Sequence, residues 1–355
     1  MRKIILPATL AVLTASGIAR ADAPSVVADI APLHSLVAQV MGSVGDPALI
    51  VSQGASPHGY AMRPSQARAL QNADAVFWVS EGLTPWLADT IETLAPDALN
   101  VELLGQPDVF RLPVREDALF EAHVHDHGAE GDHAEHHEHD EHDEKGHDEH
   151  HGAHDDKEHA EHKHAADYDN EQAEDDHHEH GDQSHDAHAW LDPANASVWL
   201  GVIAETLAAI DPENAETYLA NADAGVAELE ALRADINSTL EPVRERSFIV
   251  FHDAFQYFEN AFDFPASGAI SLSDATTPGP ARVQQIHDRV ANEEVSCVLA
   301  EPQFNQNLVA TVLDGTDAQS GVIDPVGSHL ESGPSLYPQL LRDIAQTLAK
   351  CLSPA

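Results

Sequence analysis

Short apolar runs alternate with amphipathic stretches along most of this chain. Runs such as SVVADI from Ser25 and SFIVF from Ser247 are typical of buried strands, and the segments between such runs place apolar residues at helical spacing. Brief strands that alternate with amphipathic helices predict parallel sheets covered by helices on both faces. We therefore expect an α/β protein.

This alternation occurs twice, which predicts two similar lobes. Between the two halves, Pro212 to about Leu240 keeps helical spacing over a length that would span roughly 40 Å at about 1.5 Å per residue. We interpret this stretch as one long helix that joins the lobes. The expected boundaries are an N-terminal lobe of 24–120 plus 188–210, a linking helix of 211–243 and a C-terminal lobe of 246–355.

The first residues are typical of a secretory signal peptide. Arg2 and Lys3 precede an apolar stretch from Ile4 to Ile18, and small residues follow it, so cleavage is expected after Ala21 or Ala23. A membrane helix needs about 20 apolar residues, and we see no later uninterrupted run of that length. We expect residues 1–21 to be removed and the mature protein to reside in the periplasm.

Residues 121–187 form a low-complexity segment rich in His, Asp and Glu. Twenty of the 25 histidines lie between His123 and His188. Such a composition predicts a disordered surface loop inserted into the first lobe. Imidazole suits zinc, copper and nickel, so we expect this loop to collect zinc as an auxiliary site. A merely solvating linker stays an alternative.

The formal net charge of the chain is −44, and it is near −47 once the three basic residues of the signal peptide are removed. A chain this acidic excludes nucleic acid as a partner and favours cations. We expect a monomer with a small cationic ligand.

Two cysteines are present, Cys297 and Cys351. They could pair in an oxidising compartment, where closing that loop would stabilise the fold by about 4 kcal/mol in the chain-entropy model. Two buried free thiols are the alternative.

Four metal-binding side chains are expected at the cleft between the lobes, because ligands of open parallel sheets bind beyond the carboxyl ends of the strands. His58 follows a predicted strand, His188 lies at the far edge of the His-rich loop, His252 ends SFIVF, and Asp324 ends the strand GVID. Three imidazoles and one carboxylate would satisfy a tetrahedral zinc ion. Because these residues are far apart in the sequence, their spacing alone is a weak motif.

Four segments resemble those of the ZnuA-type zinc-binding proteins of bacterial ABC importers: SPHGYAMRPSQARAL, DAHAWLDPANA, FHDAFQYFE and VIDPVG. These proteins belong to metal-binding cluster A-I, which is solute-binding protein family 9. The resemblance covers essentially the whole mature chain. It implies that His58, His188 and His252 bind zinc between two lobes and that the protein delivers zinc to a cognate membrane permease. Family members vary between a carboxylate and water at the fourth position, which Asp324 matches, and several form the disulfide.

Other functions remain open at this point. Manganese-binding relatives usually have a carboxylate where this chain has His252, so an imidazole there favours zinc over manganese or another divalent metal. A zinc-storage or adhesin-type protein would have the His-rich loop without a preformed cleft site. We expect no enzyme, because the chain has no HExxH motif or nucleophile cluster. Partners for the ring nitrogens are expected among Asp192, Asp253 and Glu301.

Overall fold

A computed structural model describes residues 23–117, 119–120, 184–272, 278–292 and 295–354, and all of these belong to one compact unit. The predicted signal peptide and most of the predicted His-rich loop lie outside the described residues.

Two four-stranded parallel sheets form the centres of two lobes, as the alternating pattern predicted. Both sheets have the same topology: the first strand of each lobe lies at an inner position and the second strand lies at the edge. The register also corresponds, because Val26 pairs with Ala75 in the first sheet and Phe248 pairs with Cys297 in the second. The strand order of the first sheet is β2 (Ala48–Leu49), β1 (Val26–Ala28), β3 (Ala75–Trp78), β4 (Leu99–Glu102), and that of the second is β6 (Ala269–Ser271), β5 (Phe248–His252), β7 (Cys297–Ala300), β8 (Gln319–Val322).

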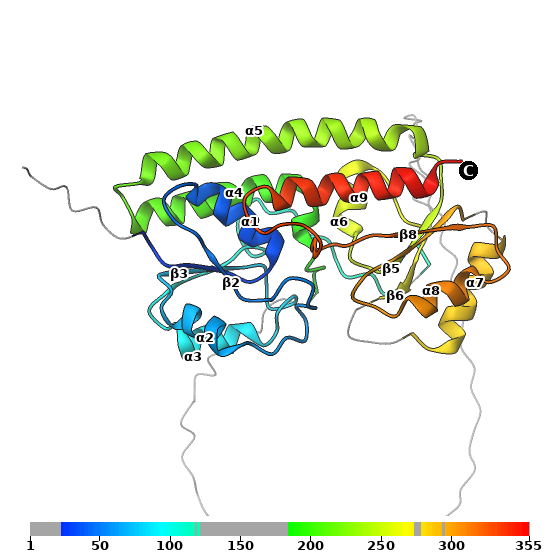
Figure 1. Ribbon diagram of the computed structural model, residues 1–355, viewed down its shortest axis with the longest axis horizontal. Coiled ribbons are helices and arrows are strands. Elements are labelled where there is room, and N and C mark those ends of the chain that lie inside the picture. Colours follow the sequence, from blue (N-terminus) through cyan, green and yellow to red (C-terminus); the bar gives the residue numbers. More distant parts are fainter. Residues whose placement is uncertain (1–22, 118, 121–183, 273–277, 293–294, 355) are drawn as a thin grey trace, which may run out of the picture. The chain divides into compact units, whose positions relative to one another are not determined.

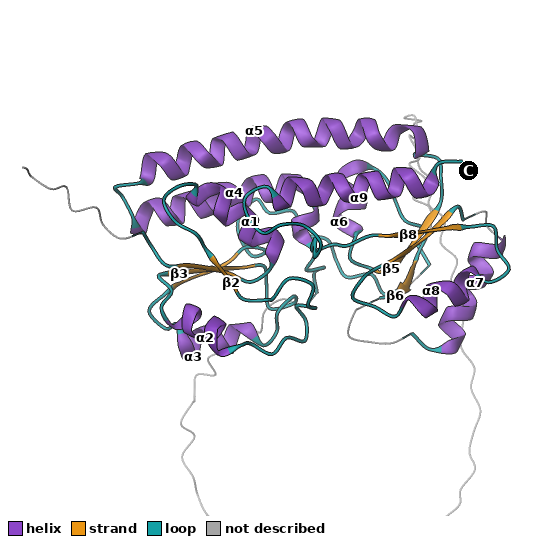
Figure 2. Cartoon of the chain, in the orientation of Figure 1, coloured by secondary structure: helices purple, strands orange, loops and turns teal. Residues whose placement is uncertain are grey.

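Helices cover both faces of each sheet (Figure 2). One face of the first sheet packs under α1 and α4 and the other over α2 and α3, while α7 and α8 lie together on one side of the second sheet (Figure 1). Their bounds are α1 Ala31–Met41, α2 Pro64–Gln71, α3 Leu87–Leu94, α4 Pro193–Ile210, α5 Ala215–Leu240, α6 Gln256–Phe262, α7 Pro280–Asn292, α8 Gln306–Leu313 and α9 Leu336–Leu352, with 3-10 turns η1 at Ala189–Leu191 and η2 at Glu241–Val243.

The predicted linking helix is present as α5, which runs over both lobes (Figure 1). The last helix, α9, lies alongside α5 and also contacts α1 of the first lobe. At its start, Tyr337 N donates to Ser35 Oγ at 3.0 Å and Tyr337 Oη donates to Trp190 O at 2.7 Å. Two helices therefore join the lobes, although the sequence predicted only one.

One hydrophobic core extends through both lobes. It includes Val37 of α1, Trp199 of α4, Leu232 of α5, Tyr257 of α6 and Leu341 of α9, all essentially inaccessible to solvent. By length and composition α4 could cross a membrane. Its buried face packs into this core, however, so we interpret α4 as a core helix of the folded unit.

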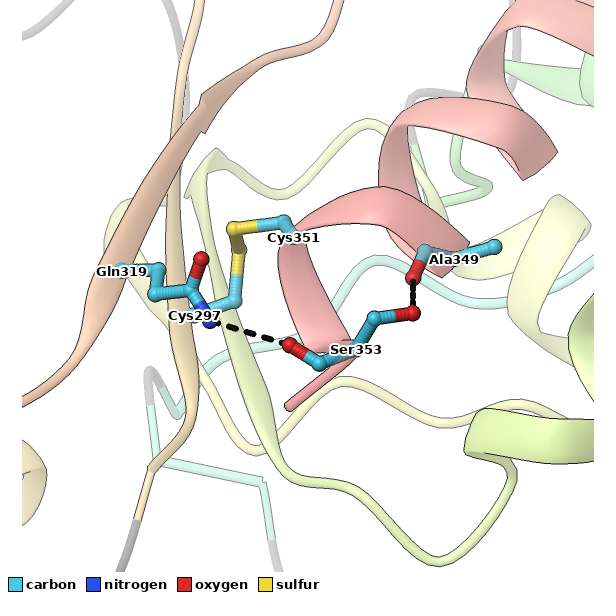
Figure 3. The surroundings of a disulfide bond; sticks show 5 residues. All are labelled: Cys297, Gln319, Ala349, Cys351 and Ser353. Atoms are coloured by element: carbon cyan, nitrogen blue, oxygen red, sulfur yellow. Dashed lines mark hydrogen bonds between the residues drawn. A yellow bond between two sulfur atoms is a disulfide. The ribbon is translucent and has the colours of Figure 1, made fainter. Parts of the chain in front are cut away.

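The two cysteines form a disulfide, which rules out the alternative of free thiols. Cys297 in β7 and Cys351 in α9 have Cα atoms 5.8 Å apart (Figure 3). Nearby, Gln319 Nε2 donates to Ser353 O at 3.1 Å. The bond thus attaches the end of α9 to the second sheet.

Candidate metal centre

Three histidine rings from distant parts of the sequence converge in the folded unit. The ring centroid of His188 lies 5.9 Å from that of His58 and 5.3 Å from that of His252. His252 is buried, and His58 and His188 are half-buried. These are three of the four predicted ligands.

Hydrogen bonds position the loop around His58, which connects β2 to α2. Ser52 Oγ and Tyr60 Oη are 2.6 Å apart, and Gln66 of α2 bonds to both of them. The carbonyl of Pro57 accepts a hydrogen bond of 2.9 Å from Trp86 Nε1. The residue next to His58 is therefore attached to the first lobe rather than placed on a free loop.

His188 is oriented by Asp186. One carboxylate oxygen, Asp186 Oδ1, lies 2.7 Å from His188 Nδ1 and accepts from His188 N at 2.9 Å. The ring packs against Trp190, with centroids 5.2 Å apart, and Trp190 Nε1 donates to Pro325 O of the second lobe at 2.8 Å.

His252, at the end of β5, has the same arrangement with Glu301. Glu301 follows β7, the strand beside β5, and its Oε1 lies 2.6 Å from His252 Nδ1 and accepts from His252 N at 3.1 Å. The edge of the His252 ring also contacts Phe304, at a centroid distance of 5.3 Å.

These carboxylates determine which ring nitrogens can bind a metal. Nδ1 of His188 and of His252 is directed at a carboxylate, and a metal-binding histidine in this usual arrangement coordinates its ion through Nε2. Tetrahedral zinc with Zn–N near 2.05 Å would place ring centroids about 5.2 Å apart. The His188–His252 pair meets this value, and the His58–His188 pair is wider by less than 1 Å.

Two cavities meet at the three rings. A cavity of about 320 Å³ and a small one of about 30 Å³ share His58, His188 and His252 in their walls, and no other residue lines both. The small cavity has room for an ion or a water molecule. Among the described residues no group of three or more His, Cys, Asp or Glu side chains stands in a geometry that could hold a metal ion. Zinc binding by the three rings therefore requires an inward shift, which the wider His58–His188 separation also predicts.

The larger cavity is acidic. Arg115 binds two carboxylates there, with Nη1 2.8 Å from Asp253 Oδ1 and Nη2 2.8 Å from Glu259 Oε2. Burial raises the pKa of the Asp253 carboxyl to about 6; Arg115 opposes the shift, and the charges of Glu259 and Asp186 add to it. Glu81 also lines this cavity, so acidic groups outnumber its one arginine and favour a cation.

Comparison with known proteins identifies the family of the chain. The family model described as "Zinc-uptake complex component A periplasmic", ZnuA, matches residues 26–351. The chain belongs to the ZnuA family. It is 45% identical over 328 residues to a high-affinity zinc uptake system protein ZnuA of Brucella suis biovar 1 (strain 1330), covering 92% of this chain and 91% of that relative.

Further relatives support the same family. A ZnuA of Paracoccus denitrificans (strain Pd 1222) is 40% identical over 354 residues, covering 98% of this chain and 99% of the relative. The crystal structure of a ZnuA deletion mutant with zinc bound shares the fold, with a TM-score of 0.66 at 20% identity, covering 94% of this chain and 100% of that one.

The fourth predicted ligand of this ZnuA family member, Asp324, lies two residues after β8. Its carboxylate accepts hydrogen bonds from Gln303, Val326 and Ser328, and it lines a different cavity, together with His329. The structure therefore brings three of the four predicted residues into one cavity wall. Asp324 as a ligand stays a prediction.

The three expected partners of the rings have three different roles. Glu301 is confirmed as the partner of His252. Asp192 instead caps α4, accepting from Ala194 N at 2.7 Å, and Asp253 pairs with Arg115. Asp186 was missed, although it lies only two residues before His188.

Asp186 was missed because the His-rich loop was expected to continue to residue 187. Val114 N instead donates to Ser184 O at 3.1 Å, and Asp186 N donates to Leu112 O at 2.8 Å. Pro113 and His185 form an antiparallel bridge. Residues 184–187 are thus ordered by backbone pairing, which composition alone does not show.

Proposed function

We propose that this protein captures Zn²⁺ between its lobes outside the cytoplasm and delivers it to the permease of an ABC importer. The observation that supports this most directly is the convergence of three imidazoles, two of them oriented through Nδ1 by the carboxylates of Asp186 and Glu301.

The chemistry of this donor set favours zinc. Three neutral imidazoles match the borderline softness of Zn²⁺, and a carboxylate behind a ring raises the basicity of its other nitrogen. The high-affinity zinc uptake named for the relatives and the zinc bound in a structural neighbour support the same cargo.

Transport also explains the position of the site better than catalysis does. The ions of a carrier must enter and leave, and the larger acidic cavity opens on the same three rings. The family model describes its members as a periplasmic component of a zinc-uptake complex. We propose that zinc is cargo, and that zinc-loaded protein shows no hydrolytic turnover on ester or peptide substrates.

The predicted signal peptide and His-rich loop complete the proposal. The signal peptide of residues 1–21 would direct the chain to the periplasm and be cleaved on export, and the predicted His-rich loop of 121–187 would bind additional zinc weakly. Ordering a flexible chain costs about 1 to 2 kcal/mol per residue fixed, so these sites should bind more weakly than preplaced rings.

Replacing single rings tests the proposal. We expect His58→Ala, His188→Ala or His252→Ala to weaken tight Zn²⁺ binding by at least about a hundredfold, measured by competition with a chelator of known affinity. The matched control is His287→Ala in α7, whose ring bonds to Asp314 O. A storage protein that binds zinc only through its loop would lose almost nothing in the three variants, and that result would contradict the proposal.

A further inference from the structure

The carboxylate of Asp324 is saturated with hydrogen-bond donors. Its Oδ1 accepts from Gln303 Nε2 at 3.0 Å and from Val326 N at 3.1 Å. Its Oδ2 accepts from Ser328 N at 2.6 Å and from Ser328 Oγ at 2.5 Å. A carboxylate has about four lone-pair positions, so no acceptor position is left for an ion.

The loop that contains Asp324 is bonded to two residues of the first lobe. Gln53, in the loop before His58, donates through Nε2 to Gly327 O at 3.2 Å and to Leu330 O at 2.5 Å. Trp190 donates to Pro325 O from the other side. These contacts attach the loop of the second lobe to the first lobe, close to His58 and His188 in the sequence.

The same loop lines the small cavity with apolar groups. Pro325 and Val326 lie in the wall of the small cavity with the three rings, whereas Asp324 lines a different cavity with His329 and Asp343. His329 Nδ1 lies 3.9 Å from Asp324 Oδ2. Gln303, which lines the small cavity, is the donor between that cavity and the carboxylate.

We propose that Gln303 and Ser328 withhold Asp324 from the bound ion, and that this withholding favours Zn²⁺ over harder ions such as Mn²⁺. Imidazole suits zinc, while carboxylate oxygen suits manganese, so a site that keeps the Asp324 carboxylate away from the ion discriminates against manganese. The inference rests on the proposed function, because it takes the three histidines as the ligands of the ion.

The test compares four proteins for both metals. Kd for Zn²⁺ is measured by chelator competition and Kd for Mn²⁺ by the electron paramagnetic resonance signal of free Mn²⁺. The proteins are the parent, the double variant Gln303→Leu/Ser328→Ala, Asp324→Asn alone and the combination of all three substitutions. We expect the double variant to bind Mn²⁺ about tenfold more tightly than the parent, because Asp324 is freed from two of its donors. The gain should disappear in the triple variant.

Three results would overturn the inference. The folded double variant could show no gain for Mn²⁺, or the gain could persist when Asp324 is also replaced. Asp324→Asn alone could weaken zinc binding as much as His58→Ala, which would make Asp324 a ligand already. The single variants Ser328→Ala and Gln303→Met give the same readout with a smaller expected gain if the double variant does not fold. A parent protein that lacks a tight zinc site would instead overturn the proposed function.

Discussion

At the scale of single residues, two carboxylates position two of the three rings of the candidate site. Asp186 and Glu301 each bond both the ring Nδ1 and the backbone N–H of their histidine. This double contact fixes the ring tautomer and the direction of Nε2 together. Part of the affinity for zinc should therefore lie outside the three rings.

We expect Asp186→Asn and Glu301→Gln each to weaken Zn²⁺ binding by about 10- to 100-fold, because an amide is a weaker acceptor than a carboxylate and does not raise ring basicity. Chelator competition measures the loss. The control is Asp288→Asn, an acid 60% exposed in α7. Affinities equal to that of the control would show that these acids do not orient metal ligands.

The sequence predicted His58, His188 and His252 as a set, and the structure brings their rings together. It could not tell which acid would meet which ring, because that depends on strand order. Glu301 reaches His252 since β7 lies beside β5. Asp324 was expected as the fourth ligand at the end of a strand, and this stays a prediction. Its carboxylate accepts hydrogen bonds from Gln303 after β7 and from Val326 and Ser328 in its own loop, and contacts of that kind are not visible in a residue pattern.

At the scale of elements, the ends of the parallel strands are joined by buried polar groups. Asp29 follows β1 and accepts from Ile30 N at 2.7 Å and, across to the end of β3, from Val79 N at 2.9 Å. It is completely buried, and burial raises its pKa from 3.8 to about 7 despite these bonds.

This shift predicts a pH dependence of stability. Because the unfolded chain loses this proton near pH 4 and the folded protein only near pH 7, the folded state binds more protons in between, and its stability should fall as pH rises through that window. Asp29→Asn should lack that contribution. Urea unfolding of metal-free protein from pH 4 to 8 measures the difference, with the exposed Asp235→Asn as control. Identical pH slopes for parent and Asp29→Asn would contradict the prediction.

The disulfide between β7 and α9 is a second link between elements. With a sequence separation of 54, its loss in Cys297→Ala/Cys351→Ala should lower the free energy of unfolding by about 4 kcal/mol in the chain-entropy model. Urea unfolding of the metal-free protein checks this, because bound zinc would add its own stabilisation. An unchanged midpoint would show that the bond contributes nothing to stability.

The hydrophobic periodicity predicted nearly every helix and strand, but it could not predict their partners. The strand predicted before His58 forms a ladder over only Ala48–Leu49 at the edge of its sheet. One helix was expected to join the lobes, yet α9 of the second lobe also contacts α1 of the first. An amphipathic face shows that a helix packs, not which surface it packs on.

At the scale of the whole molecule, α5, α9 and a shared core connect the lobes. Two helices and one continuous core resist a wide hinge opening, so loading should proceed by small adjustments around the rings. The wider His58–His188 separation makes the His58 loop the expected place of that movement.

Deletion of the predicted His-rich loop should leave the zinc site intact only if residues 184–187, which are ordered, are kept. We expect deletion of residues 121–183 to preserve one tightly bound Zn²⁺ and to eliminate the weaker ions, measured by calorimetric titration. A deletion that extends through Asp186 should weaken the tight site as well, since it removes the partner of His188. Unchanged stoichiometry in the shorter deletion would contradict a collecting role for the loop.

The central claim is that three histidine rings bind one zinc ion between the lobes. The most direct measurement is anomalous diffraction at the zinc edge from crystals of the zinc-loaded protein. The account predicts one strong peak about 2.0 to 2.1 Å from Nε2 of His58, His188 and His252. A peak bound by other residues, or three rings that point away from it, would contradict the account.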